Sequence, residues 1–235
     1  MPALSSWVVG IASLLWALLF SQASLAQAEY QGGLQGVQVE EISSHASGYT
    51  ENGQKVYRLF AELRAGYRLQ AVYGNERSPL MIGADDMVFN QDEDDVKTGD
   101  RLRAKDAHSM MADSWVTIGV CSPGMVAIPG KDSIPMTKPF ATSDILVSGT
   151  KLELFSEDSD GNTMVMDNGA WLMLDGMEGV GESGAVCIAQ IVTTGLPVYR
   201  LNLQLIAPDG SVEQWVHSHS EGVQYQSDFL SSSSP

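Results

Sequence analysis

The residues Val198 to Ile206 read "VYRLNLQLI", and their alternation decides the fold class of this chain. Apolar side chains occupy every second position: Tyr199, Leu201, Leu203 and Leu205. Polar side chains fill the positions between them: Arg200, Asn202 and Gln204. Successive side chains of a β-strand point to opposite faces of its sheet. The pattern therefore predicts a half-buried strand with one face in the core and one face in water.

The same period of two recurs along the chain, and no segment after the first 28 residues has a convincing helical repeat. In "KVYRLFAEL" it sets Tyr57, Leu59, Ala61 and Leu63 opposite Arg58 and Glu62. Arg64-Ala65-Gly66 links this segment to "YRLQAVYG" and predicts a hairpin. Further strands are predicted at Val37 to Ile42, Lys151 to Phe155, Ala170 to Leu174, Ala185 to Thr193 and Val212 to His217. Many short strands separated by turn residues predict an all-β fold, an antiparallel β-sandwich or jelly roll.

The first 28 residues have the features of a signal peptide. Trp7 to Phe20 is an uncharged apolar run too short to span a bilayer, and Ala26-Gln27-Ala28 has the small-x-small form of a cleavage site. No Lys or Arg precedes Trp7, which departs from the usual signal-peptide pattern. The alternatives are an uncleaved amphipathic anchor and a mitochondrial presequence, although a presequence needs arginines and the first one is Arg58. We expect cleavage after Ala28, a secreted or periplasmic protein, and no stable membrane span afterwards. Residues 29–217 would form a single domain and residues 218–235 a flexible serine-rich tail.

The net charge of −16 narrows the choice of partners. A phosphate backbone repels so acidic a chain, and the sequence has no basic stripe to offset that repulsion. Nucleic acid is therefore excluded as a partner. The carboxylate oxygens of Asp and Glu bind hard cations such as Ca²⁺, so Ca²⁺ is the candidate cofactor.

Cys121 and Cys187 are the two cysteines of the chain, and each lies in an apolar segment, "DSWVTIGVC" and "AVCIAQIVT". An exported protein favours a disulfide between them, placed across the core as in immunoglobulin-type domains. Two reduced, buried thiols are the alternative. Non-reducing peptide mapping distinguishes the two states.

The blocks "VYRLFAEL", "LQAVYGNERSPL", "DSWVTIG", "NGAW" and "GAVCIAQIVTTG" resemble a family of uncharacterised exported microbial domains. The resemblance runs from about Val56 to Leu205, and its Asp-Ser-Trp-Val-Thr-Ile-Gly block is the most specific part. It implies a β fold and secretion, and it implies no activity. Between Met81 and Ala112 the sequence departs from the family, with "DEDD" and "RLRAK" in place of a Gly- and aromatic-rich loop.

Three segments resemble catalytic motifs, but each lacks a residue or a spacing that its motif requires. No catalytic residue is therefore predicted. "GMVAIPGKD" has the wrong spacing for a phosphate loop, and "GESGA" lacks the second glycine of a nucleophile elbow. "ELFSED" has Phe155 where the jelly-roll glucanases carry a catalytic Asp. A secreted polysaccharide-acting enzyme, a glycoside hydrolase or lyase, is nevertheless the alternative from another functional class, because such enzymes often have jelly-roll folds.

Three groups of residues are candidate binding sites. His217 and His219 are spaced to point the same way on an extended strand and to hold one Zn²⁺ or Cu²⁺, unless they are only a solvated strand end. Asp158, Asp160 and Asn162 offer oxygen ligands for Ca²⁺ in a turn, although the spacing is not that of an EF-hand. Trp215 shares a strand face with Ser211 and Glu213, and its indole is expected to be exposed for a sugar to stack on.

These features together predict an exported, acidic binding module of the cell surface, periplasm or extracellular matrix. Its expected ligands are Ca²⁺ or a polysaccharide, and a cell-surface protein is the other candidate partner.

Overall fold

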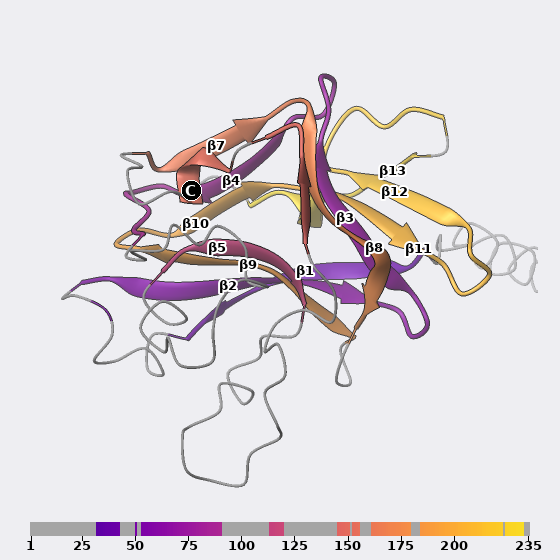
Figure 1. Ribbon diagram of the computed structural model, residues 1–235, viewed down its shortest axis with the longest axis horizontal. Coiled ribbons are helices and arrows are strands. Elements are labelled where there is room, and N and C mark those ends of the chain that lie inside the picture. The colour runs from indigo at the N-terminus through magenta and orange to yellow at the C-terminus, as the bar shows by residue number, and fades with distance from the viewer. Residues whose placement is uncertain are drawn as a thin grey trace, which may run out of the picture. The chain divides into compact units, whose positions relative to one another are not determined.

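The computed structural model describes residues 32–42, 50, 53–90, 113–119, 145–150, 152–155, 161–179, 184–222 and 224–232. The β structure belongs to Gly33–Pro235, one of the two compact units into which the chain divides. Its described elements are strands and two short 3₁₀ helices (Figure 1). The predicted all-β sandwich is confirmed. The predicted signal peptide and its cleavage site lie outside the described residues.

One sheet has four strands in the order β1-β2-β9-β5, all antiparallel. Its strands are β1 (Leu34–Glu41), β2 (Lys55–Leu63), β9 (Ala185–Thr193) and β5 (Trp115–Gly119). Both faces of β5 are buried. Among the described strands, β5 ends this sheet.

Two further sheets have the orders β13-β12-β11-β3-β8-β6 and β10-β4-β7. The six-stranded sheet contains β13 (Gln224–Gln226), β12 (Val212–Val216), β11 (Asn202–Ile206), β3 (Arg68–Gly74), β8 (Gly169–Glu178) and β6 (Leu146–Ser148). The three-stranded sheet contains β10 (Pro197–Arg200), β4 (Leu80–Ala84) and β7 (Thr163–Met166). Only the pair β12–β13 is parallel among these strands.

The three-stranded sheet continues the middle of the six-stranded one. The chain runs from β10 into β11, from β3 into β4 and from β7 into β8, and the strand order β10-β4-β7 repeats the order β11-β3-β8. The register also continues, from the pair Gly74 and Gly169 to the pair Leu80 and Met166. The predicted strand Val198 to Ile206 is thus found as two strands that meet at Leu201.

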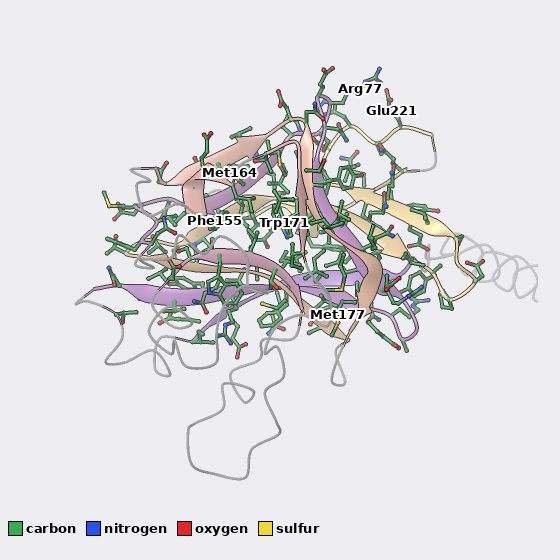
Figure 2. The ribbon with its side chains drawn as sticks, viewed as in Figure 1. Arg77, Phe155, Met164, Trp171, Met177 and Glu221 are labelled. Carbon is green, nitrogen blue, oxygen red and sulfur yellow. The ribbon has the colours of Figure 1, made fainter. Side chains whose placement is uncertain are left out.

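The main core lies between the four-stranded sheet and this composite layer (Figure 1). Its buried side chains come from all three sheets and include Leu59, Ile188, Val116, Leu203, Leu205, Leu80 and Trp171. Trp171 occupies the middle of this packing (Figure 2). Its indole Nε1 donates a hydrogen bond of 3.1 Å to the carbonyl oxygen of Thr117 on β5, which joins the two layers directly.

A second, smaller core covers the opposite face of the four-stranded sheet and contains Trp115 and Cys187. Here the predicted wet face of β2 is wrong, because Arg58 is fully buried. Its guanidinium Nε donates to the Gln190 side chain at 3.0 Å, and the group lies 5.9 Å from the centre of the Trp115 ring. Burial lowers the pKa of Arg58 to about 10, so it is still charged at neutral pH.

Cys187 faces this second core and not the space between the sheets. It pairs in register with Gly119 of β5, two residues before Cys121 in the sequence. The side chain of Cys187 thus lies on the face of its sheet opposite the main core, across which the disulfide was predicted. No free cysteine occurs among the described residues. Cys121 lies outside them, so the disulfide itself stays a prediction.

Two other local predictions are wrong. The segment Arg64 to Gly66 does not form a hairpin, because β2 pairs with β1 and β9 whereas β3 pairs with β11 and β8. It carries the chain from one layer to the other, with Gly66 at a φ of +81° that favours glycine. The predicted strand Lys151 to Phe155 is a 3₁₀ helix at Glu153–Phe155, which buries Leu154 and Phe155.

The predicted flexible tail is also wrong where the structure describes it. Residues 224–226 form β13, and Asp228–Leu230 forms the 3₁₀ helix η4. Leu230 is fully buried in the main core, and its carbonyl oxygen accepts a hydrogen bond of 2.7 Å from the Leu201 amide. Burial of two apolar residues, Leu230 and the partly buried Phe229, holds this segment against the sheets.

Substitution of Trp171 tests the link between the layers. Trp171→Phe removes the hydrogen bond to Thr117 and leaves a cavity beside it, so the free energy of unfolding should fall by about 2 to 4 kcal/mol. Denaturant unfolding measures this loss. The control is Leu174→Ala on the same strand, where the side chain is 68% exposed and the change should stay within about 0.5 kcal/mol. Equal effects of the two substitutions would mean that Trp171 does not join the layers.

Candidate functional site

The chain leaves the composite sheet between β3 and β4. Residues 75–79 separate these two strands, whereas only Asp167 and Asn168 separate β7 from β8, and only Leu201 separates β10 from β11. The middle strands, β3 and β4, are therefore joined by a longer loop than their neighbours are, here named the 75–79 loop. At its start, a Cβ on Gly74 would overlap the carbonyl group of Met166, so a glycine is needed for the strands to approach.

The 75–79 loop is folded by its own first residue. The side-chain oxygen of Asn75 accepts hydrogen bonds from the amides of Arg77, at 3.0 Å, and Ser78, at 2.8 Å. The backbone N–H of Asn75 donates in turn to the backbone carbonyl oxygen of Ser78 at 3.3 Å. An asparagine that bonds the backbone two and three residues onward stabilises a turn. The tip of the loop, Glu76 and Arg77, is thereby directed away from the sheet.

Asn202 holds both ends of this loop on the sheet. It is fully buried, and its side-chain nitrogen donates to the carbonyl oxygens of Tyr73, at 3.0 Å, and Ser78, at 2.6 Å. Its side-chain oxygen accepts from the Ser78 hydroxyl at 2.9 Å and from the His217 amide at 3.3 Å. A buried amide is tolerated only when it is hydrogen-bonded in this way. The predicted wet position of Asn202 is therefore wrong.

His217 fixes the end of the loop from the other side. Its Nε2 lies 3.0 Å from the carbonyl oxygen of Pro79. Burial lowers the pKa of His217, and the charges of Arg200 and His219 lower it further, while the hydrogen bond to Pro79 acts in the opposite direction. The folded protein thus favours the neutral imidazole.

The 75–79 loop forms one wall of a polar cavity of about 430 Å³. The other walls come from the turn between β7 and β8 and from the connection between β12 and β13. The cavity is lined by Asn75, Glu76, Arg77, Asp167, Asn168, His219, Glu221 and Gln224. Arg77 and Glu221 form an ion pair that joins two of these walls, and Figure 2 shows the two side chains together at the edge of the sheets. Every lining side chain can donate or accept a hydrogen bond.

A row of glutamines crosses the six-stranded sheet from this cavity. The amide of Gln224 on β13 donates to Gln214 on β12 at 3.1 Å, and Gln214 donates to Gln204 on β11 at 3.3 Å. Gln204 then donates to Gln70 on β3 at 2.8 Å, which donates to the Leu174 carbonyl oxygen on β8 at 2.8 Å. We call these four side chains the glutamine row. Gln224 belongs to both the row and the cavity.

The structure describes the predicted metal-ligating residues only in part. His217 is hydrogen-bonded to Pro79, whereas His219 lines the cavity with a φ of +54°, so the structure gives the two imidazoles different surroundings. Asp158 and Asp160 lie outside the described residues. The side-chain oxygen of Asn162 lies 3.4 Å from the Thr163 hydroxyl. No group of three or more metal-ligating side chains occurs in the ranges that the structure covers, and both metal sites stay predictions.

The predicted exposure of Trp215 is wrong. Its side chain is only 6% exposed, because β13 and η4 cover it. Its ring lies 5.2 Å from that of Tyr225 and 6.4 Å from that of Phe229, measured between ring centres. The indole Nε1 donates to the Glu213 carboxylate at 3.0 Å. Trp215 therefore presents no open face to a sugar.

The cavity and the glutamine row were not predicted from the sequence. The available signals were weak: a turn-forming "NERSP" between two strands, "DN" between two others, and glutamines at the polar positions of alternating segments. Gln204, Gln214 and Gln224 are ten residues apart in the sequence, whereas Gln70 is 134 residues from Gln204 and meets it only through the pairing of β3 with β11.

Comparisons with protein-family models, curated proteins and solved structures found no match. In the described part of the chain, no helix is long and apolar enough to cross a membrane.

The lowered pKa of His217 makes the free energy of unfolding dependent on pH. Since the folded state holds this pKa below 6.5, the unfolded chain takes up the proton first as the pH falls. The free energy of unfolding should therefore decrease as the pH falls through about 6.5 and below. In His217→Gln, where the amide can still donate to Pro79, this part of the decrease should disappear. Denaturant unfolding at a series of pH values measures it, and identical profiles for the two proteins would contradict the proposed role of His217.

Proposed function

We propose that this protein is an exported binding module and that the cavity beside the 75–79 loop binds a neutral carbohydrate. The observation that carries the proposal is the lining of the cavity, which consists of carboxylate, amide, guanidinium and imidazole groups from three separate connections. Its export rests on the predicted signal peptide.

The chemistry of the lining suits hydroxyl groups. A sugar hydroxyl both donates and accepts, and carboxylate and amide groups offer paired acceptors or an acceptor beside a donor. Asp167 and Asn168 lie next to each other on one wall, and Asn75 and Glu76 lie on another. A few polar groups placed in this way fix the orientation of a small ligand.

The charges of the site favour a neutral ligand over an anionic one. Three carboxylates line the cavity, those of Glu76, Asp167 and Glu221, against the cationic Arg77 and the imidazole of His219. Arg77 is already paired with Glu221. The net charge of the whole chain is −16 and repels anions as they approach.

The 75–79 loop, which forms one wall of the cavity, is held in place before a ligand binds. Asn202 and His217 hold the 75–79 loop through hydrogen bonds to Tyr73, Ser78 and Pro79, and the first of these anchors is fully buried. A site whose walls are fixed before the ligand arrives avoids the entropic cost of ordering them.

Titration calorimetry with neutral oligosaccharides tests the proposal. Arg77→Gln breaks the ion pair with Glu221, and Asn168→Ala removes an amide from the opposite wall; each should weaken binding by about tenfold, or 1.4 kcal/mol. The matched control is Lys55→Gln, which breaks the exposed ion pair with Glu41 on the four-stranded sheet. It should leave binding unchanged, and neither broken pair should alter stability by more than about 1 kcal/mol.

Two outcomes would contradict the proposal: no neutral oligosaccharide binds to the wild-type protein, or Lys55→Gln weakens binding as much as Arg77→Gln does. Release of new reducing ends during the titration would instead support the alternative of a polysaccharide-acting enzyme, since the cavity contains carboxylates.

A further inference from the structure

We infer that the glutamine row is an extended subsite, along which a linear neutral polysaccharide continues out of the cavity. This inference rests on the proposed function of the cavity and adds the form of the ligand, a chain whose further sugar units lie across the strands of the six-stranded sheet.

The row is continuous across neighbouring strands. Its four amides lie on β13, β12, β11 and β3, and adjacent strands in a sheet are about 4.8 Å apart. All four point their donors the same way, toward β8. At the other end the side-chain oxygen of Gln224 accepts from the Glu221 amide at 3.1 Å, inside the cavity wall. The glutamine row and the cavity therefore form one continuous polar surface.

The glutamines retain hydrogen-bonding capacity for a ligand. A primary amide has two N–H donors and an oxygen with two lone pairs. Within the row each side chain uses one donor, and each oxygen accepts one hydrogen bond. All four side chains are partly exposed. One donor and one lone pair remain on each of them, which is the pairing that a sugar hydroxyl requires.

The surroundings of the row offer apolar side chains to the faces of sugar rings. Leu174, whose carbonyl oxygen ends the row, is 68% exposed, and Val212, two residues from Gln214 on the same strand face, is 53% exposed. The row itself carries no charge. An extended β-linked pyranose chain advances per unit by a length close to the strand spacing, so successive units can meet successive glutamines.

Titration with a disaccharide and a hexasaccharide of the same neutral series tests the inference. In wild-type protein the hexasaccharide should bind at least about tenfold more tightly, since it adds hydrogen bonds to two or more amides. Gln204→Leu with Gln214→Leu should remove this gain and leave disaccharide binding unchanged. Gln204→Thr with Gln214→Thr gives the same result with residues that favour strands. The control is Gln38→Leu, an exposed glutamine on β1, which should change neither affinity.

The outcomes separate this inference from the proposed function. If the disaccharide binds and the hexasaccharide gains nothing, or if its gain survives the double substitutions, the inference about the row is overturned and the cavity stands. If Arg77→Gln weakens neither ligand, the proposed function of the cavity fails. If polylysine binds in place of the sugars and the double substitutions abolish that binding, the row recognises a cationic polymer and the inference is overturned.

Discussion

The architecture depends on one buried side-chain amide, that of Asn202. It makes four hydrogen bonds, to Tyr73, to both the carbonyl and the hydroxyl of Ser78, and to the backbone of His217. An amide without these partners would cost about 1 to 3 kcal/mol to bury. The partners in turn lie at the two ends of the loop after β3, where Asn202 donates to the carbonyl groups of Tyr73 and Ser78. This side chain thereby joins the ends of the loop to β11 at the point where the composite sheet passes from β3 to β4.

The same constraint explains where the polar surface lies. The 75–79 loop turns outward at the break, and with the neighbouring turn and the β12–β13 connection it borders the open cavity. Asn202 and Gln204 are two residues apart on β11 and lie on one side of the strand, so the anchor of the loop and the glutamine row share a face. The opposite side of this strand supplies Leu203 and Leu205 to the main core. The single strand β11 thus contributes side chains to the main core, to the anchor of the 75–79 loop and to the glutamine row.

The alternation of apolar and polar residues was enough to predict the fold class. It also predicted the buried apolar positions of the segment Val198 to Ile206. Tyr199, Leu201, Leu203 and Leu205 are all buried, as the pattern predicts. It could not predict that Asn202 and Arg58 are buried as well, because their burial depends on partners that are distant in the sequence, such as Ser78 and Gln190. The position of Trp215 was missed for the same reason: the residues that cover it, Tyr225 and Phe229, lie in a segment that looked like a polar tail. Periodicity reports which side of a strand a residue occupies, and tertiary contacts decide whether that side meets water.

Asn202 holds the 75–79 loop in place and so maintains the cavity. Hydrogen exchange of the backbone amides in wild type and in Asn202→Asp tests it most directly, because the carboxylate keeps the size of the side chain and loses the donors to Tyr73 and Ser78. If Asn202 holds the loop, the backbone amides of Arg77 and Ser78 should exchange many times faster in the variant, while those of β2 and β9 keep their protection. Unchanged exchange at Arg77 and Ser78 in a variant that has lost both donors would contradict it.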